Sequence, residues 1–149
     1  MKGITIRKAR RSDLSTIKSL VLELVESMDN TKGVDASHTP GNYIAALKNS
    51  NSHLLVAEIG KVVGFIHFTT RRTVLHKRPS GLIDEVVVSK DYRRKGVGRK
   101  LLSAAIEKCR QLGCCEIEVS TELANREAIE FYRGFGFEER GLLLEMDIE

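Results

Sequence analysis

The fold expected for this chain depends most on the stretch Val86-Val87-Val88-Ser89-Lys90-Asp91-Tyr92-Arg93-Arg94-Lys95-Gly96-Val97-Gly98-Arg99-Lys100. Its valines predict a buried strand, which passes through a short basic loop into two glycines that open a helix. The first turn of a helix exposes unpaired N–H groups and the positive end of the helix dipole, and glycine lets a phosphate approach the backbone. The stretch therefore predicts an anion site, and its basic residues are Arg93, Arg94, Lys95, Arg99 and Lys100.

The spacing of the glycines excludes two common classes of phosphate-binding motif. The Walker pattern G-x-x-x-x-G-K-[ST] is absent, and a dinucleotide fingerprint would need a third glycine where Leu101 stands. The pattern present is R-x-x-G-x-G, from Arg93 to Gly98. Taken alone, it also fits a solvated basic helix start that follows a tight turn.

Outward from this stretch, hydrophobic periodicity predicts a mixed α/β fold in the order β-α-α-β-β-β-α-β-α-β. Gly60-Lys61 suits a tight hairpin, Gly113 suits a helix C-terminus, and Ser12 suits a helix N-cap. One more short strand is expected near Phe137. The expected strands are 4–7, 53–59, 62–70, 82–88, 115–120 and 142–148, and the expected helices follow Ser12 and cover 42–48, 97–112 and 125–133.

Composition bounds the class of protein. The 149 residues are 42% hydrophobic and 30% charged, which predicts one globular domain over residues 1–149. The N-terminus does not resemble a secretory signal, and no apolar run reaches the roughly 20 residues of a membrane span, so we expect a cytoplasmic protein with no membrane partner. Neither the cysteines nor the histidines show metal-ligand spacing, so no metal is expected.

A second motif follows downstream. Residues 125–137 read N-x-x-A-x-x-F-Y-x-x-x-G-F, in which Asn125 can cap a helix and Ala128 shares a helix face with Tyr132. An ordinary amphipathic helix with an aromatic stripe would explain the phenylalanines alone. Both motifs, in this order and at this spacing, resemble the GNAT superfamily of N-acetyltransferases over residues 55–148. The resemblance implies one central, mixed but mostly antiparallel sheet flanked by helices in a single GNAT domain.

The resemblance also implies a cofactor and its contacts. The R-x-x-G-x-G turn would grip the pyrophosphate of acetyl-coenzyme A, the co-substrate. The backbone of the valine strand would pair with the pantetheine arm and supply an N–H to the developing oxyanion. Tyr132 matches the family's tyrosine, which protonates the departing thiolate. The expected cofactor-binding residues are Val86, Val87, Val88, Arg93, Arg94, Lys95, Gly96, Val97, Gly98, Arg99, Asn125 and Ala128.

An acetyltransferase also needs a base for the amine, and Asp84 and Glu85 interrupt an otherwise apolar strand. Adjacent strand residues face opposite sides, so only one should face the acceptor unless a bulge intervenes. We favour Asp84, where the family often carries an acid, and Glu85 is the close alternative. Solvent-facing or arginine-paired carboxylates would explain both equally well. Glu118 on the next strand is a weaker candidate.

The net charge of +4 favours anionic partners, and a nucleotide cofactor and a nucleic acid both fit that description. The expected function is direct acetyl transfer to a primary amine in a ternary complex, because no cysteine lies in a nucleophile motif. The alternatives are a non-catalytic acetyl-coenzyme A sensor, a phosphate-binding fold of another class and a basic nucleic-acid-binding module. The last is disfavoured because no aromatic–basic RNA motif occurs. The acceptor, a small molecule or a protein amine, stays open, and the family suggests a homodimer.

Overall fold

The computed structural model describes residues 3–149 of the protein. The chain divides into two compact units, Met1–Glu118 and Val119–Glu149. Each unit is described by itself.

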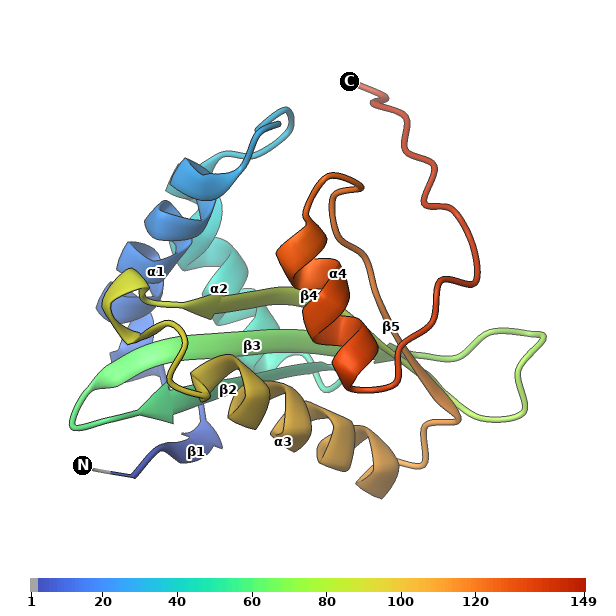
Figure 1. Ribbon diagram of the computed structural model, residues 1–149, viewed down its shortest axis with the longest axis horizontal. Coiled ribbons are helices and arrows are strands. Elements are labelled where there is room, and N and C mark those ends of the chain that lie inside the picture. Colours follow the sequence, from blue (N-terminus) through green and yellow to red (C-terminus); the bar gives the residue numbers. More distant parts are fainter. Residues whose placement is uncertain (1–2) are drawn as a thin grey trace. The chain divides into compact units, whose positions relative to one another are not determined.

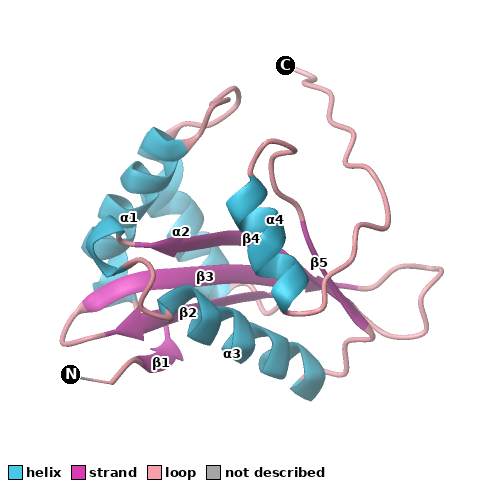
Figure 2. Ribbon diagram, viewed as in Figure 1, coloured by secondary structure: helices cyan, strands magenta, loops and turns pink. Residues whose placement is uncertain are grey.

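A five-stranded sheet in the order β1-β2-β3-β4-β5 forms the centre of the first unit (Figures 1 and 2). The first four strands pair antiparallel with their neighbours in sequence. The mixed, mostly antiparallel α/β sheet that the sequence predicted is confirmed. The strands are β1 (Thr5–Lys8), β2 (Ser52–Glu58), β3 (Val62–Arg71), β4 (Ser80–Val88) and β5 (Glu116–Val119).

Helices cover both faces of this sheet, with α1 (Leu14–Ser27) and α2 (Thr39–Lys48) on one face and α3 (Val97–Gln111) on the other (Figure 1). The face toward α1 and α2 holds a buried cluster that consists of Ile17, Leu20, Tyr43, Leu54, Val56, Phe65 and Val87. Toward the other face, α3 buries an apolar stripe at helical spacing, formed by Val97, Leu101, Leu102, Ala105 and Cys109. The amphipathic pattern of this helix therefore fixes which side of the sheet it covers.

Gly64 shows how closely α3 lies against β3. A Cβ built at Gly64 would lie 2.8 Å from the carbonyl oxygen of Val87 and 3.3 Å from Cδ1 of Leu101. A real Cβ does not fit at the first distance, so only glycine lets the helix and the strands pack this tightly here.

Local signals set most of the element ends as expected. Gly60 has a φ of 73° in the β2–β3 turn, and Gly113 has a φ of 79° just after α3, both of which favour glycine. The expectation that Ser12 caps the first helix is wrong. Asp13 stands at that position and accepts a hydrogen bond from Arg10 N at 2.7 Å, while its carboxylate also pairs with Arg7 at 2.9 Å.

The second unit contains α4 (Arg126–Gly134). The expected cap is confirmed, because Asn125 Oδ1 accepts a hydrogen bond from Ala128 N at 3.0 Å. Phe131, Tyr132 and Phe137 pack edge to face, with ring centroids 5.4 to 5.6 Å apart. None of the residues 120–149 is fully buried.

Two expected strands do not form. Residues 142–148, and the segment near Phe137, contain no assigned helix or strand. Leu142, Leu144 and Ile148 are all more than 80% exposed, at 82%, 87% and 89%. An apolar run forms a strand only when a neighbouring strand takes its backbone hydrogen bonds, and this segment has no ladder in the structure.

Candidate active site

The basic loop, residues 89–96, connects β4 to α3. Ser89 N donates a hydrogen bond to Val63 O at 2.8 Å, which ties the start of the loop to β3. A short 3₁₀ turn follows at Lys90–Tyr92. Gly96 then adopts a φ of 84° as the N-cap of α3, and Arg94 has a φ of 61°, in the left-handed region. These conformations turn the chain sharply, so that the N-terminus of α3 directly follows a cluster of cations.

The cationic side chains of the basic loop are exposed and make few contacts with the first unit. Arg93 Nε donates to Val88 O at 3.2 Å, and Lys95 Nζ lies 5.3 Å from the centre of the Tyr92 ring. Arg93, Arg94 and Lys95 are all exposed. At the start of α3, Lys100 N donates a hydrogen bond to Gly96 O at 3.1 Å. The amides that precede Lys100 belong to the helix turn that has no earlier carbonyl to pair with.

A bulge in the β3–β4 pairing changes which way the two candidate bases face. His67 pairs with Glu85, but the next residue of β3, Phe68, pairs with Ile83. Asp84 is therefore the extra residue on β4, and a bulge breaks the strict alternation of side chains. From the sequence, only one of the two carboxylates was expected to face the acceptor, unless a bulge intervened. The structure contains that bulge, so this restriction does not apply.

The hydrogen bonds show that both carboxylates lie with side chains of one face of β3. Thr69 Oγ1 donates to Asp84 Oδ2 at 3.1 Å, and His67 Nδ1 lies 2.9 Å from Glu85 Oε1. His67 and Thr69 are two apart on β3, which places them on the same face as Phe65 and hence on the α1–α2 side. We call these four residues the carboxylate cluster: His67, Thr69, Asp84 and Glu85.

Electrostatics distinguish the members of the cluster. Burial raises the pKa of Asp84 above its ordinary value, the charge of His67 and the Thr69 hydroxyl oppose this, and the charge of Glu85 adds to it. Burial lowers the pKa of His67, but its hydrogen bond to Glu85 and the charges of Glu85 and Asp84 outweigh burial, so the net pKa is raised. Asp84 is thus a stronger base than an ordinary aspartate.

Glu118, the weaker candidate, lies apart from this cluster in its contacts. Its Oε2 is 3.7 Å from Arg71 Nη2, and its side chain is 44% exposed. Between the carboxylate cluster and the basic loop, β4 contains three valines. Val86, Val87 and Val88 pair with Ile66, Phe65 and Gly64. Val87 is buried in the core, whereas Val86 and Val88 are half-buried. One strand therefore joins the carboxylate cluster to the basic loop.

Three expected site residues belong to the second unit. Asn125 and Ala128 share the cap hydrogen bond at the start of α4, and both are at least partly exposed. Tyr132 is half-buried, and burial raises the pKa of its hydroxyl. The structure brings these three together on one helix.

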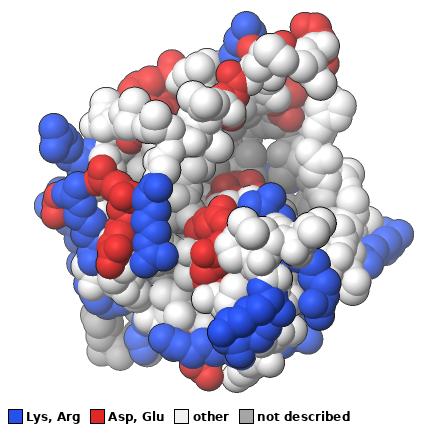
Figure 3. Space-filling view, turned by 90° about the vertical axis from the view of Figure 1, so that its right-hand side faces the viewer, with Lys and Arg blue, Asp and Glu red and all other residues white. Residues whose placement is uncertain are grey.

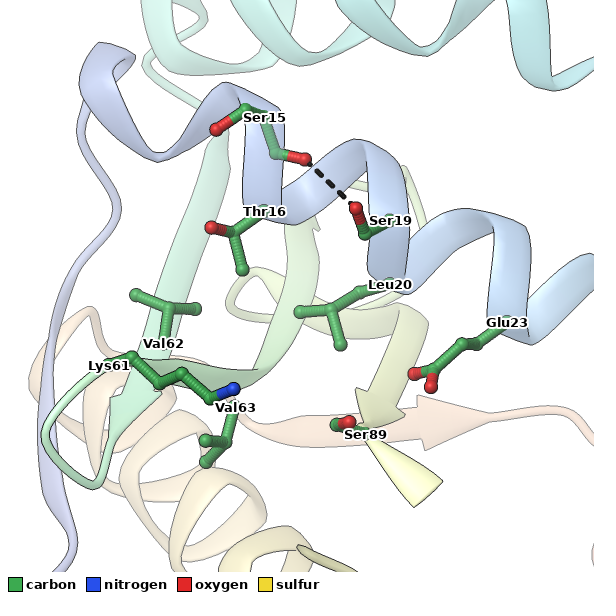
Figure 4. Close-up of a pocket in the computed structure, with 9 residues that line it drawn as sticks. All are labelled: Ser15, Thr16, Ser19, Leu20, Glu23, Lys61, Val62, Val63 and Ser89. Carbon is green, nitrogen blue, oxygen red and sulfur yellow. Dashed lines mark hydrogen bonds between the residues drawn. The ribbon is translucent and has the colours of Figure 1, made fainter. Parts of the chain in front are cut away.

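A pocket of about 360 Å³ lies between α1 and the beginning of β3 (Figure 4). Ser15, Ser19 and Glu23 line it from α1, and Ser19 Oγ donates to Ser15 O at 3.3 Å. Lys61 and Ser89 line its other side, so it adjoins the start of the basic loop. Glu23 Oε2 is shielded from solvent and has no hydrogen-bond partner in the described part of the chain. None of the expected catalytic residues lines this pocket.

Further observations concern other function classes. Within residues 3–149 no group of His, Cys, Asp and Glu side chains is arranged to hold a metal ion, and none of the helices there combines the length and apolar character needed to cross a membrane. Figure 3 shows a face on which lysine and arginine side chains lie among aspartate and glutamate side chains.

The sequence did not identify His67 and Thr69 as site residues. The segment from Arg72 to Pro79 that joins β3 to β4 is too long to fix the register of the two strands, so the partner of Glu85 could not be read from the chain. The only available signal was the placement of a histidine and a threonine two apart at the end of a strand.

Comparisons with known proteins identify the family. The model of the acetyltransferase (GNAT) family matches residues 18–137. An aminoalkylphosphonate N-acetyltransferase of Salmonella typhimurium is 30% identical over 135 residues, which are 90% of this chain and 84% of that protein. An uncharacterized N-acetyltransferase of Methanocaldococcus jannaschii is 29% identical over 142 residues, and the match spans 94% of this chain but only 63% of that relative.

A solved structure shows the same fold. AAC(6')-Iy, determined in complex with the bisubstrate analog CoA-S-monomethyl-acetylneamine, superposes with a TM-score of 0.85 over 99% of each chain at 17% identity. At that identity the likeness concerns the fold alone. The family match covers most of the chain and includes the basic loop, β4 and α4. The chain therefore belongs to the GNAT acetyltransferase family.

Proposed function

We propose that the protein transfers the acetyl group of acetyl-coenzyme A to a primary amine by direct attack within a ternary complex. The observation that carries this proposal is the arrangement along β4. Near its middle the strand carries two carboxylates that contact side chains of one face of β3, and at its C-terminal end it enters the basic loop and then the N-terminus of α3. A base and an anion site are thus joined by three valines.

The basic loop supplies the cofactor site in this proposal. Amides around Gly96, Val97 and Gly98 bind the diphosphate of the cofactor, with charge from Arg93, Arg94, Lys95 and Arg99. Asn125 and Ala128 contribute from α4, as the family resemblance implies. The coenzyme A portion of the analog bound to AAC(6')-Iy supports the same cofactor for this chain.

The acceptor must lose a proton before it can react. An alkylamine of lysine type has a pKa of about 10.4, so the neutral form costs about 4.6 kcal/mol at pH 7. Asp84, or Glu85 in its place, accepts this proton directly or through water. The amine nitrogen then attacks the thioester carbon, and an N–H of the Val86–Val88 backbone stabilises the oxyanion.

Collapse of the tetrahedral intermediate breaks the C–S bond. The departing thiolate takes a proton from the Tyr132 hydroxyl, and the raised pKa of that hydroxyl keeps it protonated until the thiolate forms. The nitrogen, positively charged after its attack, loses a second proton to solvent as the amide forms, and Tyr132 regains its proton from solvent. Cys109 does not suit an acyl-enzyme route. Cys109 is buried, and burial raises the pKa of its thiol to about 12, which leaves almost no reactive thiolate near neutral pH.

The acceptor is proposed only as a class, a primary amine on a small molecule or a protein. The Salmonella relative is named for aminoalkylphosphonates, which carry such an amine, and this supports including them in a panel. The catalytic unit is proposed to be a single domain over residues 1–149. Homodimer formation stays a prediction from the family.

The decisive experiment has two parts. Calorimetric titration with acetyl-coenzyme A should show binding, and free thiol should then appear when amines from a panel are added. The panel should contain aminoalkylphosphonates, polyamines, free amino acids and peptides with lysine or a free N-terminus. Absence of cofactor binding would refute the proposal. Binding without thiol release across the panel would instead favour a non-catalytic sensor.

A further inference from the structure

The bulge creates an electrostatic conflict that the proposed reaction does not by itself explain. It turns Asp84 and Glu85, neighbours in sequence, toward residues of one face of β3. Two carboxylates that share a site oppose each other's ionisation, so a cation beside one of them decides which is charged. The cluster contains one group that can be such a cation, His67.

His67 is mostly buried and makes one polar contact within the cluster. Its side chain is 18% exposed, and its Nδ1 lies 2.9 Å from Glu85 Oε1. Its Nε2 is shielded from solvent and has no hydrogen-bond partner among residues 3–149. The ring therefore makes its polar contact through Nδ1, and the partner of this contact is Glu85 rather than Asp84.

The contacts of Asp84 are different in kind. The carboxylate receives a hydrogen bond from a neutral hydroxyl, Thr69 Oγ1, at 3.1 Å. The carboxyl group of Asp84 is partly desolvated by its neighbours, but the residue as a whole is exposed, so a substrate or a water molecule can reach it. One carboxylate of the pair is thus anchored by an imidazole, while the other keeps an accessible oxygen.

We propose that His67 is a positioning residue that gives the two carboxylates different roles. It holds Glu85 and balances its charge, and Asp84 is left as the group that accepts the proton. In that step an N–H bond of the substrate ammonium breaks and its electron pair stays on nitrogen. The proton passes to a carboxylate oxygen of Asp84, which becomes a neutral acid and later releases the proton to solvent. This inference rests on the proposed function for the identity of the proton donor.

Other ionisable groups lie on the neighbouring strands, with partners of their own. On β2, His53 stacks on Phe68 at 5.0 Å, and its own pKa is lowered by burial and by the charges of Lys108, Lys8 and His67. On β3, Arg71 pairs with Glu118 of β5. The shifts of the Asp84 and His67 pKa values arise from burial and from groups within the carboxylate cluster, and the contacts above make His67 the partner of Glu85.

The first test needs no turnover. Nuclear magnetic resonance should follow the carboxyl carbon of Asp84 and the imidazole of His67 across a pH titration of the ligand-free protein. His67→Gln removes a cation, which destabilises the carboxylate, so the pKa of Asp84 should rise by on the order of one unit. Glu85→Gln removes an anion, so the pKa of Asp84 should fall, and that of His67 should fall with it.

The double variant His67→Gln/Glu85→Gln closes the cycle. It removes one charge of each sign, so the pKa of Asp84 should return close to its value in the unmodified protein. Glu85 is partly exposed, at 43% of its side chain, so Glu85→Gln should fold even if the His67 variants do not. An Asp84 titration that moves in neither single variant would overturn the proposal.

The second test uses activity. The acid limb of the pH profile of kcat/KM should move to higher pH in His67→Gln and to lower pH in Glu85→Gln. The matched control is His38→Gln, because His38 also lies beside a carboxylate, at 3.5 Å from Asp35, but both side chains are mostly exposed. Its profile should not move. Loss of turnover in Glu85→Gln with turnover kept in Asp84→Asn would overturn the assigned roles, whereas loss of cofactor binding in the unmodified protein would refute the proposed function.

Discussion

The basic loop and the carboxylate cluster stand at opposite ends of the same short run of valines, yet they are built differently. In the loop, the groups proposed to bind are mostly backbone amides, and their positions depend on glycine and on φ angles such as the 84° of Gly96. In the cluster, the groups proposed to act are side chains, and their positions depend on the pairing of two strands.

This difference predicts how each region responds to substitution. A backbone site tolerates the loss of one side chain but not an obstruction of its amides. A side-chain site fails when one functional atom is replaced, even if the shape is kept. Cofactor binding and turnover should therefore separate cleanly between variants of the two regions.

The largest effect is expected for Asp84→Asn. The amide keeps the shape of the side chain but does not accept the proton, so kcat/KM should fall by about 10²- to 10⁴-fold. The dissociation constant of acetyl-coenzyme A, measured by calorimetry, should stay nearly the same. Asp35→Asn, at a mostly exposed aspartate of the same unit, is the control and should change neither quantity. A matching fall in cofactor affinity would show that the two regions are not separable.

Tyr132→Phe extends the comparison to the second unit. It removes the proposed acid and keeps the ring that packs against Phe131 and Phe137. Turnover should fall by about 10- to 100-fold while cofactor binding stays nearly intact. If the variant turns over as fast as the unmodified protein, Tyr132 is not the acid.

Gly98→Asp should affect binding first. The new side chain places bulk and negative charge where phosphate is proposed to lie, so the dissociation constant of acetyl-coenzyme A should rise at least about tenfold, or 1.4 kcal/mol. Gly98→Asn is the matched control, since it adds almost the same bulk without the charge, and its effect should be smaller. Unchanged affinity in the aspartate variant would argue against the loop as the diphosphate site.

The smallest effect is expected for Arg93→Gln, which removes one exposed cation from the loop. Affinity for acetyl-coenzyme A should fall only a few-fold, because the backbone amides remain. The difference between the two proteins should shrink as salt is added, since exposed charges are screened within about 10 Å at 0.1 M ionic strength. A loss as large as that of Gly98→Asp would mean that side-chain charge, rather than the backbone, dominates the loop.

The same contrast explains what the sequence predicted well. The basic loop, the start of α3 and the Asn125 cap each depend on residues that are close together in the chain. Local sequence patterns were therefore sufficient to predict them. The strands of the first unit were also predicted, because each shows either an apolar run or an alternation of apolar and polar residues. Local chemistry decides these features, and local chemistry is what a single sequence displays.

The features that the sequence did not predict depend on distant residues. The contact between His67 and Glu85 joins positions 18 residues apart. The register of β3 and β4 at this point depends on a bulge that no local sequence pattern predicts. Residues 142–148 carry a strand-like apolar run, but a strand also needs a partner for its backbone. The periodicity of a segment therefore does not show which other segment it pairs with.

Arg94 has one further consequence for the energetics of the loop. A left-handed φ of 61° at a residue with a side chain costs on the order of 1 kcal/mol relative to an ordinary conformation. The packing of β4 and α3 on either side of the loop offsets this conformational free energy when the chain folds, before any ligand binds. Folding, rather than association, thus supplies the free energy that shapes the turn, so the anion proposed to bind here would meet a turn that is already formed.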